Sequence, residues 1–428
     1  MSEKSKINVV TLGCPKNLVD SEYLLGQLKH SNIQLVASID DADTVVINTC
    51  GFIKDAKQES IDVIMEAVGK KNRGELKKIV VMGCLSERFK KELAADIPEV
   101  DSFFGTNQLH DVLNDLNVDY KSELLGERFL TTPSHFAYLK ISEGCDNPCS
   151  FCAIPLMRGQ HRSKPIDEVV REARLLAEKG VKELIVIAQD TTYYGLDLYG
   201  ERRLAKLLGE LSGIDEIKWI RLMYTYPAKF PLDVIEAFQK FPKLCRYIDI
   251  PIQHASNSVL KSMRRGITER STRDLLLRLK NEISGVALRT TLIVGYPNET
   301  EDDFKALYDF VKEMRFHRLG VFTYSKEEGT AAFELEDSIS EEIKHERQAA
   351  IMELQKNISE DYNESLIGKK VNVLIDSQDG EFFMGRTEWD APEIDQEVFV
   401  SSRQPLKAGS FHIVTISDAV EYDLFASV

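Results

Sequence analysis

The chain has 428 residues, 43% of them hydrophobic and 29% charged, which is the composition of an ordinary globular protein of about three domains. Its formal net charge of −15 argues against generic nucleic-acid binding through a basic face, because phosphate neutralisation dominates such affinity, and is compatible with a basic protein partner. Residues 1–6 do not resemble a signal peptide, and no apolar run approaches the ~20 residues that cross a bilayer, so we expect a cytoplasmic protein.

The N-terminal segment contains three similar units, each an apolar, β-rich run followed by a loop with a cysteine and a helix-like stretch. The three cysteines are Cys14, Cys50 and Cys84. Strands that alternate with helices predict a parallel sheet covered on both faces, and ligands of such sheets gather beyond the carboxyl ends of the strands. We therefore expect the three thiols to converge on one edge, where they could hold a 4Fe–4S cluster with one open iron. The alternative is three small thiols buried near turns.

Residues 122–134 have the character of a linker, and strand-like and helix-like runs alternate for about 220 residues after it. The helix expected over 166–179 carries an apolar stripe and is followed by Gly180, which suits the C′ position. Six βα units are too few for a closed eight-stranded barrel, so the sequence predicts an open partial (β/α)6 barrel. The expected strands are 137–142, 183–188, 219–224, 247–252, 287–294 and 320–324.

Within this region Cys145, Cys149 and Cys152 form a CxxxCxxC run. Three thiolates at this spacing can hold three irons of a cubic 4Fe–4S cluster and leave the fourth open, and S-adenosylmethionine (SAM) needs such an iron to chelate and be cleaved reductively. The run resembles the signature of the radical-SAM superfamily. Three alternatives stay open: unligated thiols, a disulfide, which does not suit a cysteine-poor intracellular chain, and a zinc site, whose nearest fourth ligand would be His161.

The last part of the chain changes character. A charged amphipathic stretch over 340–365 predicts a helix that leaves the core, and residues 367–428 alternate apolar and polar side chains with a turn at Asp379-Gly380. That tail is typical of a small antiparallel β-barrel. The overall expectation is an α/β protein with domains at 5–121, 131–361 and 364–428.

Taken together, the chain resembles the methylthiotransferases, which are radical-SAM enzymes with two 4Fe–4S clusters and a C-terminal TRAM barrel. The run 12–22, Leu-Gly-Cys-Pro-Lys-Asn-Leu-Val-Asp-Ser-Glu, is similar to the RimO branch of that family. The tRNA-modifying, MiaB-like branch typically has Gln-Met-Asn after the cysteine instead. Other segments that resemble the family are 189–191, 226–227, 251–256, 293–297, 322–325 and 328–330, and 390–395 is RimO-like.

The resemblance implies methylthiolation of the β-carbon of one aspartate in ribosomal protein number twelve of the small subunit. It assigns one cluster to Cys145, Cys149 and Cys152, where SAM is cleaved to a 5′-deoxyadenosyl radical that removes a hydrogen from an unactivated C–H bond. It assigns the second cluster, with sulfur on its open iron, to the three N-terminal cysteines. A second SAM methylates that sulfur, and a flavodoxin or ferredoxin is the expected electron donor.

Four residues are candidate SAM contacts. Phe151 would lie beside the adenine, with core packing as the alternative. Gln189 and Asp190 end a strand at the active-site face, where they could hold the methionine end of SAM, although Asp190 could instead cap a helix. Arg221 lies in an apolar strand and needs an internal acceptor, which could be SAM or a salt bridge.

Two other residues can be explained by structural roles. His254 follows the fourth strand of the core, where it could face the site or be a satisfied structural histidine. Cys245 matches no cluster pattern and is predicted to be a packed thiol. The sequence identifies no catalytic acid or base and no residue that touches the substrate aspartate.

The tail helps to choose between a protein and an RNA substrate. Residues 367–428 carry five Lys or Arg and eleven Asp or Glu, a balance of −6. A barrel that grips tRNA should be basic, whereas an acidic one would attract a basic ribosomal protein, so we hypothesise that the tail docks the protein substrate. The competing functions are methylthiolation of a tRNA adenosine and a non-enzymatic iron–sulfur or zinc module.

Overall fold

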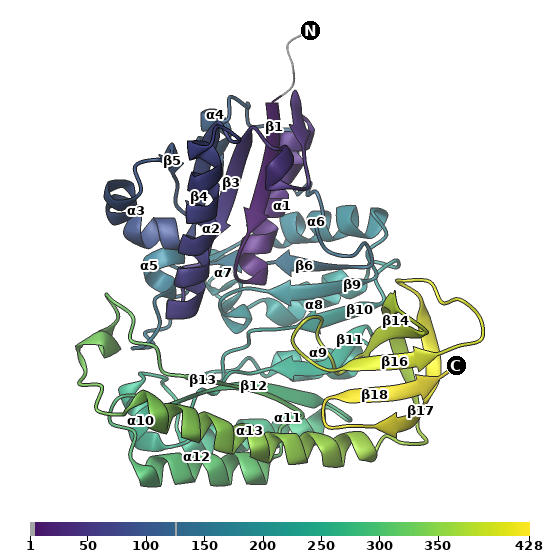
Figure 1. Ribbon diagram of the computed structural model, residues 1–428. Helices are drawn as coiled ribbons and strands as arrows, with labels where there is room; N and C mark the ends of the chain where they lie inside the picture. Colours follow the sequence, from purple (N-terminus) through teal and green to yellow (C-terminus); the bar gives the residue numbers. More distant parts are fainter. Residues whose placement is uncertain (1–4, 125) are drawn as a thin grey trace.

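The computed structural model describes residues 5–124 and 126–428, which form three bodies (Figure 1). Residues 1–4 of the predicted N-terminal segment, and position 125 of the predicted 122–134 linker, lie outside the described residues. In the part of the chain that is described, none of the helices combines the length and the apolar character that a bilayer span requires.

The first body is the predicted parallel sheet, with strand order β2-β1-β3-β4-β5. Its apolar side chains alternate between two clusters: Val45 and Ile47 face one layer of helices and Val46 faces the other. The carboxyl ends of the strands point toward the second body (Figure 1). The elements are β1 (Ser5–Thr11), α1 (Pro15–Lys29), β2 (Ile33–Leu35), η1 (Ile39–Asp41), β3 (Thr44–Thr49), α2 (Lys54–Asn72), β4 (Lys78–Gly83), α3 (Cys84–Asp96), β5 (Ser102–Phe103) and α4 (Leu109–Asp115).

The connection to the second body is packed rather than free. After η2 (Ser122–Leu124), Arg128 is buried and its guanidinium lies 3.6 Å from Glu22 of α1 and 3.3 Å from Glu172 of the second body. The backbone N–H of Phe129 donates to the carbonyl of Glu22. The predicted segment therefore connects the two bodies, but it is packed against both of them and is not a free linker.

The second body is an open sheet of six parallel strands in the order β13-β12-β11-β10-β9-β6, as the sequence predicts. The strands are β6 (Phe136–Lys140), β9 (Glu183–Ile187), β10 (Trp219–Leu222), β11 (Leu244–Asp249), β12 (Ala287–Val294) and β13 (Arg318–Thr323). A two-stranded ribbon, β7 (Ser142–Glu143) with β8 (Arg162–Ser163), brackets the CxxxCxxC run. The helices are α5 (Ile154–Arg158), α6 (Ile166–Glu178), α7 (Leu196–Tyr199), α8 (Leu204–Ser212), α9 (Asp233–Lys240), α10 (Asn257–Ser262), α11 (Glu269–Glu282) and α12 (Glu301–Met314), with η3 (Thr191–Tyr193) and η4 (Ala331–Glu334).

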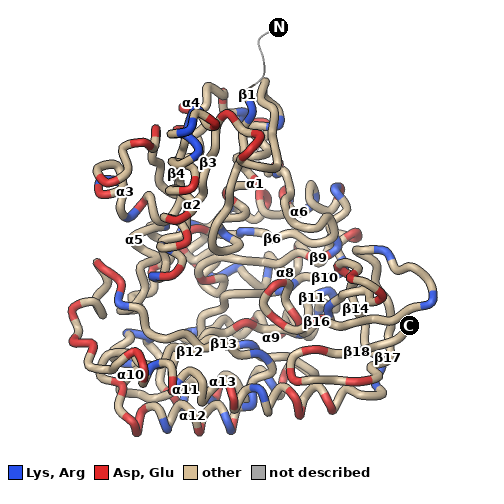
Figure 2. Tube along the Cα trace, viewed as in Figure 1, with Lys and Arg blue, Asp and Glu red and all other residues tan. Residues whose placement is uncertain are grey.

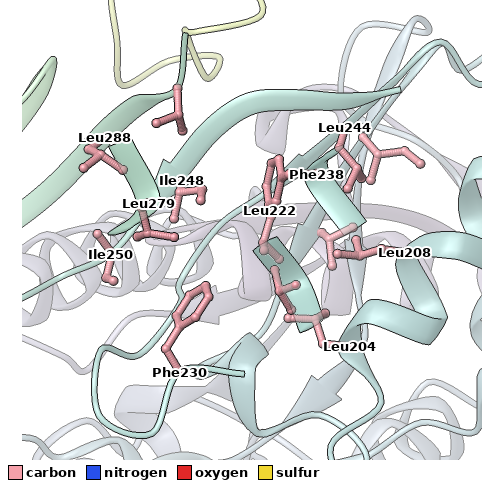
Figure 3. Close-up of a cluster of buried hydrophobic side chains, with 14 of the residues drawn as sticks. Leu204, Leu208, Leu222, Phe230, Phe238, Leu244, Ile248, Ile250, Leu279 and Leu288 are labelled. Carbon is pink, nitrogen blue, oxygen red and sulfur yellow. The ribbon is translucent and has the colours of Figure 1, made fainter. Parts of the chain in front are cut away.

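The main core lies between this sheet and its outer helices. Leu222, Ile248 and Leu288 on the strands pack against helix residues such as Leu208 and Leu279 (Figure 3). Alternate strand side chains point to the concave face, where they form a second apolar cluster with residues from α1 and from the C-terminal body. The concave face is therefore covered by both neighbouring bodies.

The helix α13 (Glu341–Glu364) follows, with the Ser340 side chain accepting a hydrogen bond from the N–H of Ile343 as its N-cap. It leads to a closed barrel in the order β14-β15-β16-β18-β17. The barrel prediction is confirmed, but β16 and β18 pair in parallel, so it is not antiparallel throughout. Five strands cannot alternate direction around a closed ring, so one pair must be parallel. The strands are β14 (Lys370–Asp379), β15 (Phe382–Thr387), β16 (Glu397–Ser401), β17 (Phe411–Ala419) and β18 (Asp423–Ser427).

The barrel packs against the starts of the core strands. Arg318, the first residue of β13, pairs with Asp390 at 2.6 Å, and the ring of Trp219, which begins β10, lies 4.9 Å from that of Phe411. The opposite ends of the strands, where the cysteine loops lie, are left to the N-terminal body.

Candidate active site

The three N-terminal cysteines follow adjacent strands. Cys50 and Cys84 come directly after β3 and β4, and Cys14 is the third residue after β1; these three strands are neighbours in the sheet. A Cβ on Gly13, whose φ is +87°, would lie 2.7 Å from the Cβ of Cys50, and one on Gly51 would lie 2.9 Å from the backbone of Cys84. The expected convergence is therefore present, and glycines allow it. The role of the thiols as cluster ligands stays a prediction.

Asn17 ties these loops together. Its Nδ2 donates to the carbonyl oxygens of Leu12 at 2.8 Å and of Thr49 at 3.0 Å, and its Oδ1 lies 3.7 Å from the Sγ of Cys84. The same Oδ1 accepts from Arg158 of the second body. Sequence reasoning quoted Asn17 only as part of a motif; its complete burial could not be foreseen from the residue type.

The other triad lies on the loop between β7 and α5. The Sγ of Cys145 accepts from the side-chain amide of Asn147 at 3.5 Å, and the Sγ of Cys149 accepts from the Nη1 of Arg265 at 3.3 Å. The Oη of Tyr226 lies 3.6 Å from Cys149, and the N–H of Cys152 donates to the Cys149 carbonyl. The loop is thus preformed, with N–H groups directed at two of its three sulfurs.

The chemistry of the thiols fits iron–sulfur clusters. Burial raises the pKa of Cys84 to about 12, of Cys145 to about 11 and of Cys152 to about 12. Buried thiolates are costly unless a cationic centre offsets the charge, and bound metal ions deprotonate thiols outright. Soft thiolate sets suit iron–sulfur clusters, in which each cysteine ligates a different iron.

His161, the candidate fourth ligand of a zinc site, is engaged elsewhere. His161 turns its Nε2 to Ser163 at 3.1 Å, with Asp197 3.7 Å away, rather than to the cysteines.

A buried ion network joins the two triads. The Nη1 of Arg158 donates to Asp20 at 2.6 Å and to Glu143 at 3.2 Å, and Lys140 pairs with the same two carboxylates. Although burial raises the pKa of Glu143, the charges of Lys140 and Arg158 lower it to about 2. Asp20 lies on α1, and Glu143 directly precedes the loop of Cys145. This network therefore sets the position of one triad relative to the other.

The four candidate SAM contacts have different surroundings in the structure. The Nε2 of Gln189 donates to Glu143 at 2.6 Å, while its Oε1 is a buried acceptor without a partner among the described residues. Asp190 caps η3 by accepting from the N–H of Thr192 and also accepts from Asn147 at 2.8 Å, so it holds the cysteine loop. Phe151 is half-buried and packs against the cluster around Tyr296.

Arg221 is the exception, and here the structure corrects the SAM assignment. Its Nε donates to Glu183 at 2.7 Å, and its other nitrogens donate to the carbonyl oxygens of Glu388 and Thr387 in the C-terminal body. The side chain is fully buried, and all three nitrogens are engaged. The internal salt bridge, considered above as the alternative, is the one that is present.

Cys245 agrees with the interpretation made from the sequence, whereas His254 agrees only in part. The Nδ1 of His254 accepts from the N–H of Ser256, and burial lowers the pKa of His254 to about 3, but its Nε2 lies 3.8 Å from Glu299 and has no hydrogen-bond partner among the described residues. Cys245 is fully packed in the concave-face cluster.

Sequence reasoning missed Lys16, the second residue of α1. It is buried, and its Nζ lies 2.9 Å from the ring centroid of Tyr224, just after β10. Burial lowers the pKa of Lys16 to about 8, although Cys14 and Asp249 act in the opposite direction. A lysine two residues after a cysteine gives no sequence pattern that would predict this position.

Comparisons with known proteins agree with this organisation. Family models match the chain over 6–105 ("Uncharacterized protein family UPF0004"), 139–311 (radical SAM superfamily) and 367–428 (TRAM domain). The chain is 54% identical to "Ribosomal protein uS12 methylthiotransferase RimO" of Christiangramia forsetii, covering 99% of this chain and 94% of the relative. It is 53% identical to the protein of the same name from Cytophaga hutchinsonii, covering 100% and 98%. A solved radical SAM methyltransferase, TsrM of Kitasatospora setae, has a TM-score of 0.55 at 14% identity over 77% of each chain, which shows the fold alone.

Proposed function

Because the chain belongs to the ribosomal protein uS12 methylthiotransferase family, we propose that it transfers a methylthio group to the β-carbon of an aspartate in uS12. It is a radical-SAM enzyme. The observation that carries the proposal is the pair of cysteine triads, one in the N-terminal body and one in the second body, joined by the network of Arg158 and Glu143. Such a pair suits a reaction that must make a substrate radical and supply sulfur at one place.

In this proposal the ligand sets are those expected from the sequence. When bound, two 4Fe–4S clusters and SAM supply the electron and the radical chemistry that an unactivated C–H bond requires. The unpaired Oε1 of Gln189 fits an N–H of the amino group of SAM, because a buried acceptor needs a donor. Phe151 offers a ring beside the cysteine loop. Asp190 acts as a positioning residue through Asn147, and Arg221 is not part of the SAM site.

The test uses anaerobically reconstituted protein with SAM, a strong reductant and a sulfur source. A peptide spanning the target loop of uS12 and a tRNA lacking methylthiolation are offered in parallel, and mass gain is measured on each. A methylthio increment on the peptide alone supports the proposal; an increment on the tRNA alone overturns it. Cys14→Ala should still cleave SAM without transferring sulfur, whereas Cys145→Ala should do neither.

The C-terminal barrel remains the proposed docking body for uS12, but some of its charged side chains form ion pairs within the protein. Asp390 and Asp395 pair with core arginines, and Arg386 pairs with Asp376 and Glu183. Without these four barrel residues, four basic and eight acidic side chains remain, so the balance is still −4. Deleting the barrel would uncover buried arginines of the core. Charge reversal at exposed Asp379 and Glu381 is the cleaner test, and unchanged affinity for uS12 would refute this docking role.

We also infer that an acidic one-electron carrier, such as a flavodoxin or ferredoxin, docks on one groove of the second body. Acidic and basic residues are interspersed over most of the chain (Figure 2). This groove, of about 1030 Å³, is instead lined by four basic residues, Lys229, Lys261, Arg264 and Arg278, and one acidic residue, Asp274. A basic ribosomal protein would be repelled there, whereas an acidic carrier would be attracted.

The groove also lies beside the second triad. Lys261 and Arg264 line a neighbouring pocket with Ser150, which is next to Cys149 in the chain. Arg265, the residue after Arg264, donates to the Sγ of Cys149. A carrier docked here approaches a cluster ligand closely, as electron transfer requires. Air-sensitive clusters and such a carrier suit the cytoplasm, which we keep as the proposed location.

The experiment compares two reductants. Lys261→Glu with Arg264→Glu should slow SAM cleavage driven by a reduced flavodoxin roughly tenfold or more at low salt, because charge steering changes association rates on that scale. Cleavage driven by dithionite should be unchanged. Lys305→Glu on the exposed face of α12 is the matched control. Equal losses with both reductants would contradict the docking site.

A further inference from the structure

Lys16 has a largely buried side chain, and its ammonium group has no acceptor among the described residues. Its side chain leaves the N-terminal body and reaches the carboxyl end of the core sheet, where its Nζ lies over the ring of Tyr224. Only 8% of the residue is exposed, and no hydrogen bond or ion pair is formed by its Nζ within residues 5–124 and 126–428. A largely covered ammonium group is retained where something pairs with it, and the Nζ of Lys16 is not among the fully buried polar atoms of the described residues, so an anionic partner can still reach it.

The nearby carboxylates cannot serve as that partner, because they are already used. Asp20 and Glu143 each pair with two other cations of the network between the triads. Asp249 pairs with Arg289 at 2.9 Å, and its other oxygen accepts from the backbone N–H of Tyr224. None of these three carboxylates is therefore left to pair with Lys16.

The aromatic platform beneath the ammonium is held firmly. Tyr224 has a φ of +58°, its N–H donates to Asp249 at 3.0 Å, and its carbonyl accepts from the N–H and the hydroxyl of Thr191. A cation over an aromatic face keeps its N–H groups free for an anion on the other side. The arrangement presents a fixed cation two residues from Cys14, with a largely buried side chain and an accessible Nζ.

We propose that Lys16 binds the side-chain carboxylate of the substrate aspartate and so determines specificity for that residue. The inference rests on the proposed function and deepens it, since it names the group that recognises the substrate side chain. The reacting β-carbon is bonded directly to this carboxylate carbon, so a cation that fixes the carboxylate also fixes the carbon. Charge-assisted hydrogen bonds from an ammonium to a carboxylate are short and strong, which suits this positioning.

The test measures binding without turnover. Reconstituted enzyme with SAM, but without reductant, is titrated with a labelled uS12 target-loop peptide and with the same peptide carrying Asn in place of the target Asp. Wild type should bind the Asp peptide at least about 30-fold more tightly, the scale expected when one partner of a buried charge pair is lost. Lys16→Met, which nearly conserves volume, should abolish the preference without weakening the Asn peptide. Lys16→Arg should keep part of it.

Iron content and reductive SAM cleavage are measured on the same variants. Full iron content, unchanged SAM cleavage and lost Asp preference in Lys16→Met support the inference. A retained preference, equal weakening of both peptides, or loss of one cluster overturns it, and the last result would assign Lys16 to the N-terminal cluster. If wild type gives the peptide no mass gain under turnover conditions, the proposed function itself fails, which is a different outcome from a wild type that reacts and a variant that still discriminates.

Discussion

Arg221 connects the core sheet to the C-terminal barrel, and replacing it should destabilise the protein rather than impair SAM binding. Arg221→Met removes a fully buried hydrogen bond of 2.7 Å to Glu183 and a partly buried one of 2.7 Å to the Glu388 carbonyl. Breaking a buried ion pair by removing one partner costs about 3 to 5 kcal/mol. Because Arg386 still lies 2.9 Å from Glu183, we expect the lower end of that range, about 3 kcal/mol.

The two tryptophans of the chain can report on this loss of stability. Trp219 and Trp389 both lie where the barrel meets the core: one stacks edge-on against Phe411, and the other donates its indole N–H to the Gly285 carbonyl at 3.0 Å. Urea unfolding followed by tryptophan fluorescence therefore reports on this interface. Arg221→Lys, which keeps the charge but not the planar fork, should lose less stability. Lys305→Ala, at an exposed pair on α12, should shift the midpoint too little to resolve.

The opposite pattern would refute the reasoning. If Arg221→Met unfolded at the wild-type urea concentration but raised the KM for SAM severalfold, Arg221 would be a cofactor ligand and its pairing with Glu183 incidental. A stability loss without a change in KM would support the structural assignment.

Two further predictions concern the N-terminal triad and the dependence of stability on pH. Gly13→Ala should remove about four iron atoms per reconstituted chain, because its Cβ would lie 2.7 Å from the Cβ of Cys50; Gly74→Ala, also at positive φ but with open space around it, should keep full iron content. Burial lowers the pKa of His254 to about 3 and of His317 to about 4, so below about pH 6.5 the unfolded chain binds more protons than the folded one. Burial raises the pKa of Glu299, which lies 3.8 Å from His254, to about 7, so this carboxyl acts in the opposite direction and offsets about one histidine. Stability should therefore fall as pH falls from 6.5 toward 4.5, by up to about 1.4 kcal/mol per pH unit in all, and urea midpoints that are flat between pH 7 and 5 would contradict this.

Much of the fold follows from local patterns in the chain. Periodicity predicted a helix over 166–179, and the structure has it at Ile166–Glu178; Ser340 is the N-cap at the predicted start of α13. Strand ends were shifted by up to three residues, since β11 begins at Leu244. The meeting of Cys14, Cys50 and Cys84 was also predictable, because neighbouring parallel strands bring their carboxyl ends to one edge.

The sequence by itself thus determined the fold class, both cysteine triads and the family, since spacing and periodicity are properties of short stretches of chain. Only the tertiary structure decided what each buried charge faces. Arg221 is paired by residues 38 positions before it and 167 after it, and Lys16 crosses from one body to another to reach the ring of Tyr224. A buried charge interacts with whatever the fold places a few ångströms away, and no local pattern encodes that neighbour.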